Sequence, residues 1–266
     1  MSDHAQKHPF HLVDPSPWPM VAALSAGLFT GGMVYFMHSD RMLTDFWLAA
    51  IGIAGILFVM FRWWSDVVQE SRIYHNPVVQ IGLRYGMSLF IASEVMFFVA
   101  FFWAFFQSAL LDFNPSVTQW PPAGIEVLDP WDLPFINTLI LLLSGCTLTW
   151  AHHACLEGNK KHMVQGLAIT VLLGIAFLSC QAYEYHHAAF AFDDGIYPST
   201  FYMATGFHGF HVFVGTVFLA VCLYRANRGD FKPDHHFGLE AAAWYWHFVD
   251  VVWLFLFFSV YIWGGA

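Results

Sequence analysis

The sequence predicts an all-α membrane protein with seven transmembrane helices. Of its 266 residues, 58% are hydrophobic and only 11% are charged, whereas a water-soluble domain carries about 25% charged residues. The apolar residues also gather into stretches near the roughly 20 residues that cross a bilayer as a helix. The predicted spans are 18–37, 44–61, 79–109, 134–155, 164–183, 200–224 and 241–263.

Local signals characterise the first three spans. Ser16 can cap the first helix, and Pro17 suits its first turn, where no amide donor is required. The polar, aromatic stretch 62–77 that follows the second span predicts a short interfacial helix. The third span is long enough to tilt strongly or to project beyond the bilayer. We divide the chain into an N-terminal inner segment (1–16), helices 1 and 2 (17–70) and helices 3 to 7 (71–266).

The basic residues in the connections orient the spans. Nine of the ten lysines and arginines fall on one side, and only Arg41 falls on the other. By the positive-inside rule, the N-terminus lies inside and the C-terminus outside. An odd number of spans agrees with this orientation. The nine residues are Lys7, Arg62, Arg72, Arg84, Lys160, Lys161, Arg225, Arg228 and Lys232.

Charge and cysteine usage argue against other classes of protein. A net charge of −9 argues against nucleic acid as a partner, because nucleic-acid-binding domains carry a basic patch. The first apolar stretch is too long for a signal peptide and has no cleavage site. The cysteines form no Cys-x-x-Cys pair, so we interpret them as reduced packing residues. They are Cys146, Cys155, Cys180 and Cys222.

Five ionisable residues lie near the middle of three predicted spans: Glu94, His208, His211, His247 and Asp250. A charged side chain at the bilayer centre costs roughly 2.5–3.5 kcal/mol on insertion scales, so such residues usually have partners or a task. His208 and His211 are three residues apart and share one helix face, as do His247 and Asp250. All five fall at similar depth, and we expect them to meet in one polar layer.

Three hypotheses can explain this layer. A metal or haem site would use the three histidines with a carboxylate, but two histidines three residues apart on one helix cannot ligate opposite faces of a haem. A proton or ion path would use Glu94 and Asp250 as relay sites, although the spans show few of the paired Gly and Pro breaks typical of transporters. A hydrogen-bonded network that holds the helices in register is the interpretation we favour.

Two further patterns concern lipid contact and helix packing. Trp63 and Trp64 beside Arg62, and Trp244 and Trp246 near Arg225, combine a cation with aromatic surface on the inner side, which suits an anionic lipid head group. A plain interfacial anchor explains each tryptophan singly. Pairs of small residues four apart predict close helix approach at Gly27 and Gly31 and at Gly82 and Gly86.

Six stretches, several of them rich in Trp and His, occur in order over essentially the whole chain. They are Asp14–Pro19, Gly82–Met87, Ser93–Phe98, Thr149–His153, Ala204–Val212 and Trp244–Phe255. Together they resemble subunit III of the haem-copper cytochrome c oxidases. The resemblance implies seven helices, divided into two and five by a V-shaped cleft that holds structural phospholipids.

The resemblance also implies where the chemistry lies. This chain holds no metal or other cofactor besides bound phospholipids, while haem a, haem a3, CuA and CuB belong to partner subunits. The main partner is subunit I, with subunit II and a small subunit IV as further partners. Glu94 matches a buried carboxylate that reacts with a carbodiimide. By match to the family, the lipid-binding residues are Trp63, Trp64, Glu70, His75 and Arg225.

The resulting hypothesis is a non-catalytic core subunit III of an aa3-type cytochrome c oxidase, the complex that oxidises cytochrome c, reduces oxygen and pumps protons. Its expected roles are to stabilise subunit I, to bind phospholipids and to support proton uptake and turnover. We expect the bacterial inner membrane, with the mitochondrial inner membrane as the alternative. Two other functions stay open: a proton- or ion-conducting protein, and subunit III of a quinol oxidase or nitric-oxide reductase.

Overall fold

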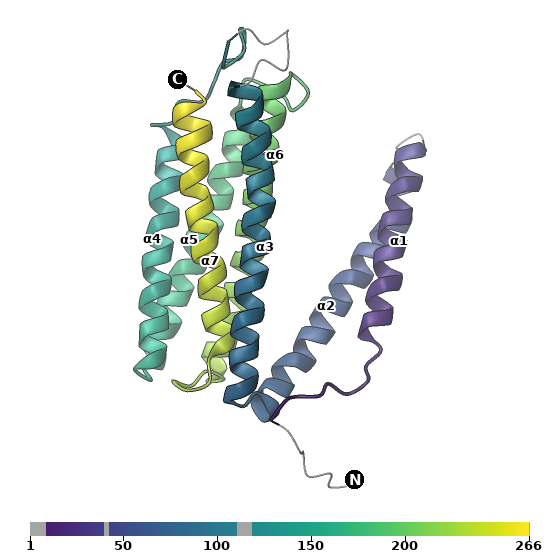
Figure 1. Cartoon of the computed structure of the whole chain (residues 1–266), viewed down its shortest axis with the longest axis vertical. Coiled ribbons are helices and arrows are strands. Elements are labelled where there is room, and N and C mark those ends of the chain that lie inside the picture. Colours follow the sequence, from purple (N-terminus) through teal and green to yellow (C-terminus); the bar gives the residue numbers. More distant parts are fainter. Residues whose placement is uncertain (1–8, 40–42, 111–118, 266) are drawn as a thin grey trace. The chain divides into compact units, whose positions relative to one another are not determined.

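The computed structural model describes residues 9–39, 43–110 and 119–265, and the regular structure of these ranges is helical (Figure 1). Seven helices of the described chain are long and apolar enough to cross a membrane, which confirms the predicted fold class. In chain order the elements are α1 (Trp18–His38), the 3-10 helix η1 (Leu43–Phe46), α2 (Trp47–Tyr74), α3 (Pro77–Leu110), α4 (Leu133–Leu156), α5 (Lys160–His187), α6 (Ile196–Arg228), α7 (Phe237–Leu256) and the π-helix η2 (Phe257–Trp263), which continues α7.

Helix α2 is longer than predicted, and the separate interfacial helix expected at 62–77 is wrong. No glycine or proline interrupts the sequence between Arg62 and Tyr74, so nothing ends the helix before the Asn76-Pro77 step. The predicted Ser16 cap of α1 is also wrong, because Pro17 occupies the N-cap position and no side chain caps the helix.

Three later helices begin about one turn before the predicted spans. Helix α5 shows the reason: its first turn is polar, and Asn159 Oδ1 accepts a hydrogen bond from the His162 amide at 3.2 Å. Helix α6 ends at Gly229, whose φ of 77° lies in the left-handed region that glycine adopts without strain. A polar first turn such as that of α5 is helical, but it lies outside the apolar run from which the span was predicted.

The chain divides into two compact units, Met1–Leu83 and Arg84–Ala266. This boundary lies inside α3 rather than at residue 70, and the predicted division into domains stays a prediction. Residues 1–8 of the predicted inner segment and Arg41 lie outside the described residues. The inside and outside positions of the two termini also stay a prediction.

In the first unit, α1 and α2 meet backbone to backbone (Figure 1). A Cβ added at Gly32 would overlap the backbone of Ala49, and one added at Gly52 would overlap the backbone of Phe29. Glycine is therefore required at both positions for the two helices to approach this closely. At Gly27, Gly31, Gly82 and Gly86 an added Cβ would meet nothing within 4 Å among the described residues of this chain, so close helix approach at these glycines stays a prediction.

In the second unit, α7 supplies much of the core. Trp246 and Trp253 are fully buried, and each indole also has a partner on α4. Trp246 Nε1 donates to Ser144 Oγ at 2.8 Å, and Trp253 Nε1 donates to Thr138 Oγ1 at 2.9 Å. A buried indole usually needs such an acceptor. These two bonds fix the rotation of α7 against α4, and this rotation decides where the polar residues of α7 lie.

Candidate functional site

Glu94 and His211 form a pair that joins α3 to α6. Glu94 Oε2 lies 2.9 Å from His211 Nε2, and the His211 ring is almost fully buried against Phe98, with ring centroids 4.9 Å apart. His211 Nδ1 lies 2.6 Å from the Phe207 carbonyl oxygen. Ser93 Oγ donates its one hydrogen to the Phe90 carbonyl at 2.6 Å and lies 3.4 Å from Glu94 Oε1.

The partners of His211 determine its proton count. A carbonyl oxygen only accepts, so Nδ1 carries a hydrogen. The hydrogen between Nε2 and Glu94 then belongs either to a neutral carboxylic acid or to an imidazolium. Both forms have zero net charge, and both satisfy the two groups without a further cation. Such a pair suits an apolar environment.

His247 and Asp250 form a second pair, which lies on α7 and faces α4. His247 Nδ1 lies 3.3 Å from Asp250 Oδ2, and His247 Nε2 lies 3.3 Å from Thr149 Oγ1. A Cβ added at Gly145 of α4 would lie 2.6 Å from Asp250 Oδ2, so a glycine at this position makes room for the carboxyl group.

His208 has a different partner from the other two histidines. Its Nε2 lies 3.2 Å from the Val249 carbonyl oxygen, so this nitrogen donates and links α6 to α7. The ring is 99% buried and packs against Trp253 and Phe177, with centroids 5.1 and 5.7 Å away.

The five predicted residues therefore meet as two pairs and one single contact rather than as one layer. In the described part of the chain, no hydrogen bond joins the Glu94–His211 pair to the His247–Asp250 pair. His211 is directed at α3, His247 at α4 and His208 at the α7 backbone. Among the described residues, no three His, Cys, Asp or Glu side chains converge on a metal position. This arrangement does not fit a bound metal or haem.

Two groups of polar contacts, one partly exposed and one buried, are not predicted from the sequence. Arg84 of α3 binds Glu240 of α7 in a two-pronged contact with distances of 2.9 to 3.0 Å. Glu184 is buried near the end of α5, where it accepts from Tyr261 and Gln181. The sequence places Glu184 three residues after Gln181, a spacing at which two side chains meet on one helix face. The predicted span ended at residue 183 and so left Glu184 out.

The expected lipid-binding residues lie in both units. In the first unit, Trp63 and Trp64 are exposed on α2, while Glu70 and His75 are half-buried. In the second unit, the Arg225 guanidinium stacks over Phe231 at 4.6 Å and lies 3.8 Å from Asp230 Oδ2. Trp246 was placed at the inner surface by its position in the sequence, and this was wrong because its ring is buried in the core.

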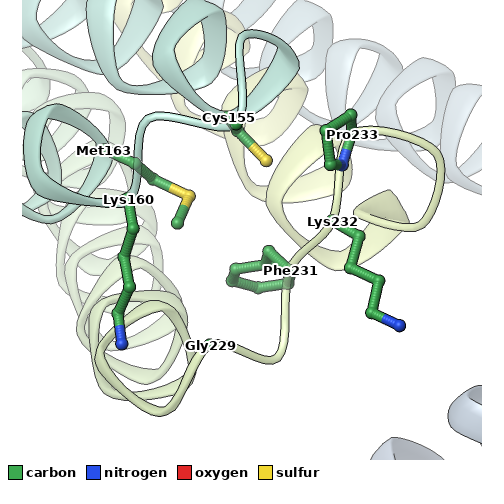
Figure 2. Close-up of a pocket in the computed structure, with 8 residues that line it drawn as sticks. Cys155, Lys160, Met163, Gly229, Phe231, Lys232 and Pro233 are labelled. Carbon is green, nitrogen blue, oxygen red and sulfur yellow. The ribbon is translucent and has the colours of Figure 1, made fainter.

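A shallow pocket lies where the connection between α4 and α5 meets the connection between α6 and α7. The side chains of Cys155, Met163, Phe231 and Pro233 line it, whereas the ammonium groups of Lys160 and Lys232 extend away from it (Figure 2). Figure 2 shows no polar side chain converging on the pocket. The side chains directed into it are apolar apart from the Cys155 thiol.

Comparison with known proteins identifies the family. The family model for cytochrome c oxidase subunit III matches residues 8–265. The chain belongs to this family. Relatives called cytochrome c oxidase subunit 3 include those of Prototheca wickerhamii, 57% identical over 98% of this chain and 100% of that protein, of Marchantia polymorpha, 58% identical over 98% of each, and of Osphranter robustus, 54% identical over 98% of this chain and 99% of that protein.

Membership of the cytochrome c oxidase subunit III family confirms the resemblance carried by the six sequence stretches. It makes this chain a subunit of the oxidase complex, a respiratory oxidoreductase. The seven helices that can span a membrane agree with this assignment. The roles of Glu94, His211, Asp250 and the lipid-binding residues within the complex stay predictions.

Proposed function

We propose that this chain is the supporting core subunit of an aa3-type cytochrome c oxidase, which oxidises cytochrome c, reduces oxygen to water and pumps protons. The chain stabilises subunit I, binds structural phospholipids and sustains proton uptake during turnover. The observation that carries this role is the pairing of Glu94 with His211. Because Glu94 and His211 satisfy each other, and the Phe207 carbonyl accepts from His211 Nδ1, the pair acts as a link between α3 and α6.

The redox centres belong to the partners in this proposal. Haem a, haem a3, CuA and CuB reside in subunits I and II, subunit I is the main contact, and a small subunit IV is a further partner. The directions of His208, His211 and His247 toward three separate partners support a chain that ligates none of these centres.

The Glu94→Gln variant of the assembled complex tests this role. A glutamine keeps the size of the side chain and can donate to His211 Nε2, so we expect the number of protons pumped per electron to stay nearly unchanged. Complete loss of pumping would refute the supporting role and favour an ion path through Glu94 and Asp250. That rival function has less support, because these two acids lie in separate pairs.

Phospholipid contact is the second part of the proposal. The residues that match the family's lipid-binding positions are Trp63, Trp64, Glu70, His75 and Arg225. Exposed indoles on α2 and a guanidinium stacked on Phe231 support contact with the interface between head groups and acyl chains. The lipid-filled cleft implied by the resemblance stays part of this proposal.

Lipid analysis of the purified complex tests the phospholipid contact. We expect the double variant Trp63→Ala/Arg225→Ala to lose bound phospholipid and to inactivate sooner during turnover. Trp47→Ala is the matched control, because Trp47 is 56% exposed at the opposite end of α2. Equal lipid content in the double variant and the control would count against these residues as the binding site.

For the location, we propose the bacterial inner membrane, with the mitochondrial inner membrane as the alternative, and an N-terminus on the inner side. The asymmetric distribution of lysine and arginine supports this orientation. Protease digestion of sealed vesicles with a tag at each terminus tests it. A tag at the N-terminus should be protected in right-side-out vesicles and cleaved in inverted ones, and the reverse pattern would refute the orientation.

A further inference from the structure

Glu184 is enclosed in the second unit, where α5 and the end of the α7–η2 helix lie side by side. Glu184 is 4% exposed, and its neighbours Gln181 and Tyr261 are buried to a similar degree. Tyr261 Oη donates to Glu184 Oε1 at 2.7 Å, and Gln181 Nε2 donates to the same oxygen at 2.9 Å. The other carboxyl oxygen, Oε2, is buried and has no hydrogen-bond partner among the described residues.

The register of α4 against α5 points to Asn137 of α4 as a neighbour of this place, with two more unpartnered atoms. Helices α4 and α5 are antiparallel, with Thr147 bonded to Thr170 and with Gly166 against Ala151. Continuing this register sets Asn137 opposite Cys180, and the neighbouring Gln181 lies on the helix face that carries Thr170. Asn137 is fully buried, and neither its Oδ1 nor its Nδ2 has a partner within the described residues.

The unpartnered atoms form a set that can be counted: Asn137 Oδ1, Asn137 Nδ2, Gln181 Oε1 and Glu184 Oε2. If Glu184 were ionised, the set would contain three acceptors and one donor, and no cationic side chain of the described chain pairs with the carboxylate. If Glu184 holds a proton on Oε2, the set contains two donors and two acceptors. Counted as atoms, donors and acceptors are equal in number in the protonated form, and Asn137 Nδ2 carries a second hydrogen for a further acceptor.

We propose that Glu184 is a neutral carboxylic acid and that Asn137, Gln181 and Glu184 enclose a bound water molecule. A water molecule has two donor and two acceptor positions, which match the two acceptors and two donors left over at this place. Burying unpartnered amides and a carboxyl group is unfavourable, and one water molecule removes that cost for all of them. The site links α4, α5 and η2 through this water molecule.

Infrared spectroscopy of the assembled oxidase complex tests the protonation state. At neutral pH, the wild-type-minus-Glu184→Gln difference spectrum should contain the C=O stretching band of a carboxylic acid. The matched control is Glu157→Gln, because the Glu157 side chain is 60% exposed and should contribute only carboxylate bands. Carboxylate bands in the Glu184→Gln difference spectrum would overturn the proposal.

A second variant and a direct observation keep the proposal testable if Glu184→Gln does not assemble. Asn137→Leu removes a partner of the bound water, so the carboxylic acid band should remain but shift in frequency. An unshifted band would show that Asn137 does not belong to the site. A high-resolution structure of the wild-type complex should show a water molecule within hydrogen-bond distance of Glu184 Oε2, and a direct contact between Oε2 and Asn137 without water would refute the water site.

Discussion

Helices α4 and α5 meet through small residues, whereas α3 meets α6 and α7 through large ones. At the α4–α5 interface, Gly166 lies against Ala151 and the backbone of Thr147, and Thr147 bonds to Thr170 at 2.8 Å. On α3, Phe101 stacks on Phe207 with centroids 5.0 Å apart. In a membrane, helix association depends on close packing and on hydrogen bonds between helices, because lipid is as apolar as the helices themselves.

The difference shows two ways of building a helix contact in lipid. The α4–α5 interface depends on the absence of side-chain atoms, so it cannot accept an added carbon without moving a backbone. The α3 interface depends on side chains with rotatable bonds, and it is held at two depths by polar pairs, Arg84–Glu240 and Glu94–His211. We therefore expect substitutions at the two interfaces to differ in cost.

The largest effect is expected at the α4–α5 interface. In Gly166→Ala the added Cβ lies 2.8 Å from Ala151 Cβ and 2.9 Å from the Thr147 carbonyl oxygen, so the helices must separate. Overpacking of this kind costs about 1–3 kcal/mol, and we expect a value near the upper end. Thermal denaturation of the complex measures it, with Gly209→Ala as control because nothing lies within 4 Å of that Cβ. Equal stability of the two variants would refute the close-packing argument.

A smaller effect is expected when the middle polar pair of α3 is broken. Glu94→Leu leaves the buried Nε2 of His211 without a partner, which costs about 1–2 kcal/mol. Glu94→Gln keeps a donor for this nitrogen, so its loss of stability should be less than half that of Glu94→Leu. The midpoints of thermal dissociation of the complex give the order, and a Gln variant as unstable as the Leu variant would contradict the hydrogen-bond explanation.

Gly145→Ala separates backbone crowding from side-chain crowding. The added Cβ lies 2.6 Å from Asp250 Oδ2, which is the far end of a side chain and can turn away. An off-rotamer side chain costs about 0.5–1.5 kcal/mol, so Gly145→Ala should be less harmful than Gly166→Ala. The same denaturation experiment compares them, and a reversed order would mean that Asp250 is held more rigidly than its long 3.3 Å contact with His247 suggests.

The smallest effect is expected at the aromatic contacts of α3. Phe101→Leu removes the stacking on Phe207 but keeps an apolar side chain of similar length. Aromatic pairs contribute about 0.5–1.5 kcal/mol beyond area burial, and because both rings are partly exposed the loss should lie near the lower end. A loss as large as that of Gly166→Ala would show that the side-chain-mediated interface does not adapt.

Apolar run length predicted the number of helices because bilayer thickness sets a lower limit on each span. It did not predict where helices end. Helix α2 continues through Arg72, and α5 begins at Lys160, because polar residues without glycine or proline remain helical outside the apolar region. Glu184 was missed for the same reason, since its helix extends beyond the apolar run.

Helix rotation was the second limit. A membrane helix is apolar toward lipid and toward its neighbours, so hydropathy does not distinguish a buried tryptophan from one at the interface. Trp246 was therefore placed at the surface, although it donates to Ser144 in the core. The spacing of His208 and His211 predicted a shared face, but not that Val249 and Glu94 would be their partners.

The single proton between Glu94 and His211 also has an electrical consequence. A respiratory membrane carries a potential, and a full charge that crosses it changes in energy by roughly 2.3 kcal/mol per 100 mV. The pair has no net charge in either of its two forms. Its energy therefore depends on the potential only through the short shift of one proton along the contact between Glu94 Oε2 and His211 Nε2. The contact between α3 and α6 therefore has nearly the same strength whether the membrane is energised or not.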